Sequence, residues 1–385
     1  MPYQQYEWTA IAPWLTLFLV PGIGPRRFYQ LLEKMGTPEN VLAANPSSLT
    51  GLPKESVEGL RQLQKHSGEI YSAIQQQLED TYLWFEKPHH YIIPFQTSLY
   101  PKLLQELVDA PPLLFVNGQL EFLSLKQIAV VGSRNPSNQG QENAYSFAAE
   151  LSSRGYVVTS GLAYGVDAAA HQGALASGGA TIAVLGTGLD VVYPARHKAL
   201  AERISERGAL ISDFPLSTKP QSSNFPRRNR LISGLSTGVL VVEATLNSGS
   251  LITARLAAEQ GRDVFAIPGS IHNPLSKGCH ELIRQGAKLV DQVDHIVEEV
   301  RRQTPPNVQH IDFENNEASA KTFEPELNAE QQSVMEALED TTCHIDQIVL
   351  RTTLNVQQVA DALLHLELSG FIESVPGGYR KRMKS

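Results

Sequence analysis

The sequence predicts an α/β protein whose central domain is a doubly wound parallel sheet, with a small helical domain before it and another small domain after it. Short runs of Val, Ile, Leu and Ala recur through the middle of the chain, as in strands that are buried on both faces. Helix-like stretches separate these runs, and many of them end at glycine. A polar, proline-bearing stretch at 301–325 sets the last part of the chain apart. Regular alternation of strands and helices is typical of doubly wound sheets.

The composition predicts a cytoplasmic protein of two or three domains. The chain has 385 residues, of which 42% are hydrophobic, and this is enough for a large core. Cys279 and Cys343 are far apart and fit neither a disulfide framework nor a zinc site, so we expect a reducing compartment and no metal. No apolar run reaches the ~18 residues that span a bilayer. The start, "MPYQQYEW", lacks the basic region of a signal peptide, so we expect no membrane association.

The first segment, 1–80, predicts a small helical domain. In "LFLVPGIGPRRFYQLLEKMG", Gly22 and Gly24 permit a tight turn between two helix-like stretches. This pattern resembles a helix-hairpin-helix or SAM-like domain, whose turn can present backbone N–H groups to a DNA phosphate. It equally fits a packing domain that binds nothing. We favour this second interpretation, because the repeat of the pattern in "LTGLPKESVEGLRQL" is degenerate.

The middle segment, 81–300, predicts the sheet. Its strand-like runs are "QIAVVGS", "YVVTSG", "TIAVLGTG", "ALISDFP", "GVLVVEA" and "DVFAIPG". The helix-like stretches between them include "QENAYSFAAELSSRG", "VDAAAHQGALASGG", "HKALAERISERG" and "SLITARLAAEQG". In such sheets, ligands bind beyond the carboxyl ends of the strands.

The last segment, 326–385, predicts a winged helix. Helix-like stretches precede a hairpin that is expected to turn at Gly377-Gly378, and in "VQQVADALLHLELSG" the apolar residues recur with a helical period. Such a domain either places a helix in a DNA groove or docks a protein. The exposed face of this helix is not strongly basic, so we favour docking or weak contact with DNA.

Four of the strand-like runs are followed by glycine loops, and all of these loops except Gly161–Asp167 also contain a small hydroxyl residue or an arginine. These loops are Gly132–Arg134, Gly161–Asp167, Gly186–Gly188 and Asn247–Ser250. Glycine lets a phosphate approach the main chain, while hydroxyl groups, helix N-termini and arginine supply donors. A single glycine loop can serve only as a tight turn. Because four occur together, we predict that at least two bind phosphate.

The segment "NFPRRNRLISGLS" is a second candidate anion site. It groups Arg227, Arg228, Asn229 and Arg230 before a helix that is expected to begin near Leu231. Arginines at the start of a helix oppose its macrodipole, so an external anion would relieve this cost. The alternative is a solvated basic face with carboxylate partners inside the protein.

The sequence predicts no catalytic centre and no cofactor. It contains no Walker A loop, no G-x-G-x-x-G, no H-E-x-x-H and no G-x-S-x-G. Asp167 and His171 are spaced to share one helix face, but no nucleophile accompanies them. We therefore expect Asp167 to cap its helix and His171 to pack or hydrogen-bond structurally.

Several long motifs resemble the DNA-processing protein A family (DprA, also Smf). They are "VVGSR", "SGLAYGVDAAAHQGAL", "AVLGTGLDVVYP", "SDFPLSTKPQSSNFPRRNRLISGLS" and "NSGSLITARLAAEQGRDVFAIPGS", within 100–290. The resemblance implies an extended Rossmann-like fold that binds single-stranded DNA without cutting it. It also implies a homodimer, and a partnership with the RecA recombinase, which the family loads onto incoming DNA in natural transformation.

Together, the loops, the arginine segment and the resemblance predict a set of residues that bind DNA phosphates. They are Gly132, Ser133, Arg134, Gly161, Gly186, Thr187, Gly188, Lys198, Phe225, Arg227, Arg228, Asn229, Arg230, Asn247, Ser248, Gly249, Ser250 and Thr253. Tyr164 stands where many members of the family carry a basic residue. A tyrosine there would stack on a base, and Lys198 would supply the missing charge.

A nucleotide-processing enzyme is the alternative to a binding protein. The phosphoribohydrolases that resemble lysine decarboxylases share a Rossmann-like fold and use a P-G-G-x-G-T-x-x-E loop. The corresponding stretch here is "NSGSLITA", which lacks the glutamate. We therefore expect that the protein is not an enzyme.

Overall fold

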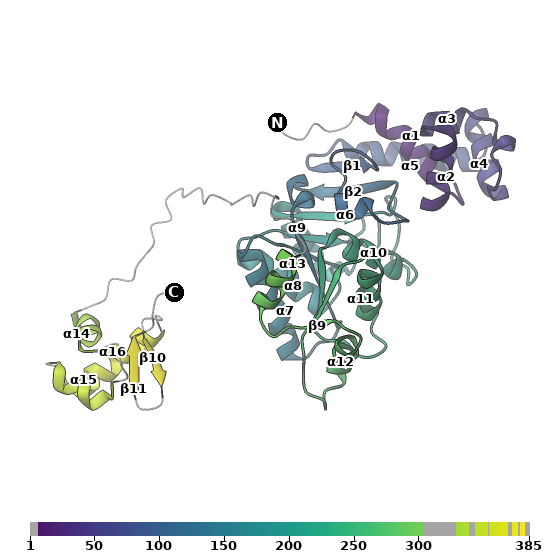
Figure 1. The fold of residues 1–385 in the computed structure, drawn as a ribbon. Helices are drawn as coiled ribbons and strands as arrows, with labels where there is room; N and C mark the ends of the chain where they lie inside the picture. The colour runs from purple at the N-terminus through teal and green to yellow at the C-terminus, as the bar shows by residue number, and fades with distance from the viewer. Residues whose placement is uncertain are drawn as a thin grey trace. The chain divides into compact units, whose positions relative to one another are not determined.

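The computed structural model describes residues 7–302, 329–338, 343–352, 354–368, 372–375 and 378–381 (Figure 1). The chain divides into two units, Met1–His310 and Ile311–Ser385. The linker expected at 301–325 lies outside the described residues except for its first two positions. Among the described residues, no helix combines the length and apolar character needed to cross a membrane.

The first unit begins with a helical region. Its elements are α1 (Trp8–Leu19), α2 (Pro25–Met35), α3 (Pro38–Ala43), the 3₁₀ turn η1 (Pro46–Ser48), α4 (Lys54–Lys65) and α5 (Glu69–Phe85). The tight turn between α1 and α2 is present. Gly22 has φ of 78°, and a Cβ there would approach the Ser56 hydroxyl to 2.7 Å, so this position requires glycine.

A sheet of nine strands forms the centre of residues 7–302. The strands are β1 (His90–Pro94), β2 (Leu113–Gly118), β3 (Gln127–Val131), β4 (Val157–Ser160), β5 (Thr181–Val184), β6 (Ala209–Ser212), β7 (Gly238–Val241), β8 (Asp263–Ala266) and β9 (Lys288–Leu289). Their order is β1-β2-β6-β5-β4-β3-β7-β8-β9, and pairing is parallel from β6 to β9. All six predicted strands are therefore confirmed. The strands β1, β2 and β9 were not predicted.

Helices and short turns connect the strands. They are α6 (Lys102–Gln105), η2 (Leu120–Ser124), α7 (Asn138–Ser153), α8 (Val166–Ala176), η3 (Ala195–His197), α9 (Lys198–Arg207), α10 (Asn224–Leu235), α11 (Gly249–Glu259), η4 (Pro274–Ser276), α12 (Lys277–Arg284) and α13 (Val293–Arg302). The two faces of β3 show the layering. Ile128 and Val130 pack with α7, α8 and α13, whereas Ala129 and Val131 pack with α10, α11 and α12. The predicted doubly wound arrangement is confirmed.

The start of α10 differs from the prediction. The helix begins at Asn224, not near Leu231. Pro226 lies in the first turn, where its missing N–H has no intrahelical acceptor to lose, so proline is tolerated there. The arginines of this segment therefore lie on the helix itself, in its first two turns, and project in directions that the helical repeat determines.

The second unit contains three helices and a hairpin in its described residues, as predicted. The elements are α14 (Ala329–Ala337), α15 (Ile345–Arg351), α16 (Val356–Leu368), β10 (Ile372–Val375) and β11 (Gly378–Lys381). The two strands pair antiparallel, and apolar residues of the helices, such as Val334, Ile348 and Leu363, form its core. Cys343 in this unit and Cys279 in the first are both buried free thiols.

Candidate nucleic-acid interface

A cavity of about 580 Å³ lies where the loops after β3, β4 and β7 meet the first turns of α10. Its lining includes Gly132, Ser133, Arg134, Asn135, Ala163, Asp167, Ser222, Phe225, Pro226, Arg228, Asn229, Thr245, Ser248, Gly249, Ser250 and Thr253. Parallel strands end at one edge, and neighbouring strands bring their loops together there. Three of the four predicted loops contribute residues to this cavity, which we call the central cavity.

The loop after β3 is held by the segment that follows β7 and by the start of α8. The N–H of Ser133 donates to the carbonyl of Glu243 at 2.7 Å, and the N–H of Val166 donates to the carbonyl of Ser133 at 3.1 Å. A Cβ at Gly132 would lie 2.7 Å from the side chain of Val166, so only glycine fits this approach. The loop thus has a fixed position beside the cavity.

Arg134 is the exposed cation of the central cavity. Its guanidinium lies 5.5 Å from the centre of the Phe225 ring, within the range of a cation–π contact. None of the described carboxylates forms an ion pair with it. The charge of Arg134 is therefore available to an anion in the cavity.

Arg228 is buried beneath the central cavity. Its guanidinium donates to the carbonyl of Gly161 at 2.6 Å, to the carbonyl of Val184, and to the side-chain oxygen of Asn229 at 3.2 Å. Burial lowers the pKa of Arg228 to about 10, although the nearby Asp167 carboxylate opposes this shift. The group remains charged at neutral pH and gives the cavity a positive floor.

Asp167 supports the loop after β4 and does not cap its own helix, so that part of the prediction is wrong. Its carboxylate accepts the N–H groups of Gly161 at 3.1 Å and Ala163 at 3.2 Å, whereas the N-cap position of α8 is Gly165. Asp167 is buried, and burial raises its pKa. The carboxylate is committed to backbone donors, which keeps the loop in place.

The N-terminus of α11 faces the same cavity. Ser248 is its N-cap: the hydroxyl accepts the N–H of Ser250 at 3.3 Å and lies 2.7 Å from the Ser250 hydroxyl. The positive end of a helix macrodipole and two adjacent hydroxyl groups favour an anion. Thr253, one turn later, is buried and lines the cavity, while Asn247 is exposed before the cap.

The loop after β5 does not line the central cavity. Gly186 lies under the Phe225 ring, which a Cβ at this glycine would approach to 3.1 Å. The Thr187 hydroxyl is buried and donates to the carbonyl of Val191 at 2.6 Å, and Gly188 packs against Pro215. These contacts place the loop in a supporting position beneath Phe225. Lys198 is exposed at the start of α9 and is not among the lining residues.

Two exposed tyrosines flank the central cavity. Tyr164 and Tyr193 are 42% and 45% exposed, and both line a small adjoining hollow of about 40 Å³ together with Phe225. Tyr193 lies 5.7 Å from Phe225, and Tyr164 lies 5.0 Å from the ring of His197. Tyr164 was predicted from the sequence, but Tyr193 was not, because "VVYP" carries no signal that an aromatic ring will face the loops.

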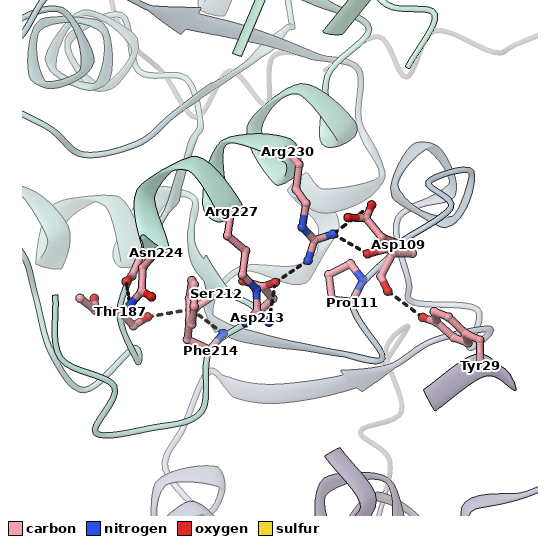
Figure 2. Close-up of polar contacts among 12 residues, drawn as sticks. Tyr29, Asp109, Pro111, Thr187, Ser212, Asp213, Phe214, Asn224, Arg227 and Arg230 are labelled. Carbon is pink, nitrogen blue, oxygen red and sulfur yellow. Dashed lines mark hydrogen bonds and ion pairs between the residues drawn. The ribbon is translucent and has the colours of Figure 1, made fainter. Parts of the chain in front are cut away.

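Arg227 and Arg230 do not line the central cavity but project from α10 toward Asp213 (Figure 2). Arg230 is buried, with its guanidinium 2.6 Å from Asp213 and 3.5 Å from Asp109. Arg227 is 42% exposed and lies 3.3 Å from the same Asp213 carboxylate. Carboxylate partners inside the protein, the alternative left open by the sequence, are therefore present for these two arginines. Asp213 itself was not predicted.

His171 has the structural role that was expected, and it predicts acid sensitivity. Its Nδ1 lies 2.7 Å from the Thr181 hydroxyl, and burial, with smaller electrostatic contributions from His197 and Arg228, lowers its pKa from 6.5 to about 3. Because the unfolded imidazole takes up a proton first, stability present above pH 6.5 is lost as the pH falls toward 3. His171→Asn should flatten this part of the pH dependence in urea unfolding. Parallel profiles for both proteins would contradict the assignment.

The mostly parallel sheet, with helices on both faces, is that of a Rossmann-type α/β protein, and a positively charged cavity lies at its carboxyl edge. The chain belongs to the DNA recombination-mediator protein A family, which residues 91–301 match, and residues 318–378 match the DprA winged helix domain. The family resemblance, the α/β fold and the winged helix predicted from the sequence are confirmed.

Relatives and solved structures agree with this assignment. The chain is 44% identical to Protein Smf of Escherichia coli over 83% of this chain and 84% of that protein. It is similar to the X-ray structure of DNA processing protein A from Streptococcus pneumoniae, with 37% identity, a TM-score of 0.64, and coverage of 77% of this chain and 99% of that one. A structure from Helicobacter pylori, described by its single-stranded DNA binding mode, is 28% identical with a TM-score of 0.51, over 56% of this chain and 99% of that one.

Proposed function

We propose that this protein binds single-stranded DNA as a recombination mediator and that the central cavity holds the phosphates of the strand. The observation that carries this proposal is that the exposed, unpaired Arg134 and the N-terminus of α11 line the same cavity. A permanently charged guanidinium and a helix N-terminus in the lining of one cavity suit a phosphate. Tyr164 and Tyr193 beside the cavity offer rings on which bases can stack without sequence preference.

The finer parts of the proposal follow from family membership. Single-strand binding is named for the relative from Helicobacter pylori, and the matched family is one of recombination mediators. We extend both properties to this chain, together with loading of the RecA recombinase, natural transformation as the setting, action as a homodimer, and the cytoplasm as its location. In this proposal, Lys198 and the Gly186–Gly188 loop lie outside the central cavity and contact the strand only at the margin of the site.

Binding without chemistry is favoured over nucleotide processing. The residues that line the central cavity include no Cys, His or Lys, and Asp167 is the only carboxylate among them. Asp167 is already occupied by two backbone N–H groups. A general acid or base needs a group that is free to exchange a proton with the substrate, and this lining offers none.

Arg134→Ala tests the proposal. In fluorescence anisotropy with a labelled oligo-dT, affinity should fall roughly tenfold, since a hydrogen-bonded charge contact is lost. The logarithm of affinity should also depend less steeply on the logarithm of salt, by ~0.7, because one phosphate contact is removed. Arg203→Ala, on an exposed position of α9 away from the cavity, is the matched control and should change neither quantity. An unchanged salt slope for Arg134→Ala would show that Arg134 does not contact the strand.

A further inference from the structure

A second basic cavity lies on the other side of α10 from the central cavity. Its volume is about 750 Å³, and it is lined by Gly24, Pro25, Arg26, Arg27, Gln30, Asp109, Arg227 and Arg230. Residues from the start of α2 form one wall and residues of α10 form the other. We call this space the arginine groove.

The α2 wall is positively charged and has no cap. Gly24 is the N-cap of α2 and Pro25 its first residue, so no side chain satisfies the positive end of this helix. Arg26 and Arg27 follow directly, and both are exposed. Arg27 donates to the carbonyl of Gly22 at 2.9 Å, which holds its guanidinium beside the turn.

The α10 wall adds positive charge that its carboxylate partners do not fully neutralise. Asp213 is shared by Arg227 and Arg230, and Arg230 also approaches the half-exposed Asp109. The lining of the arginine groove therefore carries four guanidinium groups, whereas only two carboxylates pair with them: Asp109 in the lining and the buried Asp213 outside it. Arg227 is the accessible member of this wall, since its guanidinium packs 4.6 Å from the Phe214 ring and remains 42% exposed.

The two walls are fixed to each other through the segment between β1 and β2. The Tyr29 hydroxyl of α2 donates to the carbonyl of Ala110 at 2.9 Å, and Arg230 donates to the carbonyl of Asp109 at 2.5 Å (Figure 2). Tyr29 also packs 4.7 Å from the ring of Phe95. The arginine groove is thus a built feature of the first unit, with both walls anchored to adjacent residues of one loop.

We infer that the arginine groove is a second phosphate-binding track for the same DNA strand, which continues from the central cavity around α10. This inference rests on the proposed function. Consecutive residues of α10 serve both sites: Arg228 and Asn229 line the central cavity, while Arg227 and Arg230 line the groove. A site of this size with charges on two walls suits a flexible polyanion, because single-strand grooves follow the backbone with distributed cations. The helical region then contributes directly to DNA binding, contrary to the packing role favoured from sequence.

The test compares oligo-dT of two lengths on the full chain that carries Arg26→Glu and Arg27→Glu together. A strand of ~6 nucleotides that fills only the central cavity should bind as it does to the unchanged protein. A strand of ~30 nucleotides should bind roughly tenfold or more weakly, with a salt slope reduced by about 1.4 for two lost contacts. Lys34→Glu with Lys65→Glu makes the same change of charge on exposed positions of α2 and α4 and is the matched control.

Each outcome separates the inference from the proposed function. A loss of affinity that is confined to the long strand supports DNA binding in the arginine groove. If the affinity falls for neither strand, or falls equally in the control, the groove does not bind DNA, and the proposed role of the central cavity is unaffected. If the unchanged protein binds neither strand, the proposed function itself fails. Among the residues that the structure describes, Arg26 forms no hydrogen bond or ion pair, unlike Arg27, which binds the carbonyl of Gly22. Arg26→Ala alone should therefore still reduce the long-strand salt slope by about 0.7, without the risk of local unfolding near Gly22.

Discussion

Arg228→Met is expected to lower the free energy of unfolding by about 3–5 kcal/mol, because it removes one partner of a buried charge network. The guanidinium of Arg228 is buried, it satisfies the carbonyls of Gly161 and Val184, and it faces the buried Asp167 carboxylate. Methionine fills similar volume but leaves these groups without a donor. Urea unfolding of the full chain, followed by circular dichroism, measures the change.

The matched control for this substitution is Arg203→Met, which changes an exposed arginine of α9 and should alter stability by less than about 0.5 kcal/mol. A loss below about 1 kcal/mol for Arg228→Met would mean that the internal hydrogen bonds of Arg228 contribute little to stability. This result would favour the role predicted from the sequence, in which Arg228 binds a DNA phosphate.

Asp213→Ala is expected to have an effect of similar size, about 3–5 kcal/mol, because it leaves the Arg230 guanidinium buried without its closest carboxylate. Both side chains of this pair are nearly inaccessible, and they are 2.6 Å apart. By contrast, Asp109→Ala removes a half-exposed carboxylate 3.5 Å from Arg230 and should cost less than about 1 kcal/mol. Thermal and urea unfolding of the two variants, side by side, provide the comparison.

A double substitution distinguishes the loss of an ion pair from simple loss of packing. If the cost of Asp213→Ala comes from an isolated buried charge, then adding Arg230→Met should recover much of the lost stability. Additive losses in the double variant would contradict this explanation and would indicate that the two side chains stabilise the fold independently.

The sheet was predictable because parallel strands buried on both faces read as unbroken apolar runs, as in "IAVV" before Gly132. The missed strands lack this signal. β1 contains His90 and Pro94 and lies at the sheet edge, and β9 has only two residues. β2 is apolar, but it pairs antiparallel with both neighbours, so it falls outside the alternation of strand and helix on which the prediction depended.

The candidate site was predictable where it depends on topology and unpredictable where it depends on side-chain direction. The loops after β3 and β7 converge because adjacent parallel strands end at one edge. The loop after β5 has the same composition, yet its Thr187 hydroxyl is used internally. The separation of Arg227 from Arg228 required the true start of α10, since an error in the start of a helix misplaces every side chain around its axis.

Because residues of α10 line two basic cavities, the number of residues in the first turns of this helix determines the geometry of both sites. Adding or deleting one residue between Pro226 and Leu231 would rotate the preceding turn by ~100° relative to the rest of the helix. Arg227 would then leave Asp213, and Arg228 would leave the carbonyls beneath the central cavity. An insertion or deletion in this stretch would therefore turn the arginines away from their partners on both sides of the helix and disrupt both sites at once.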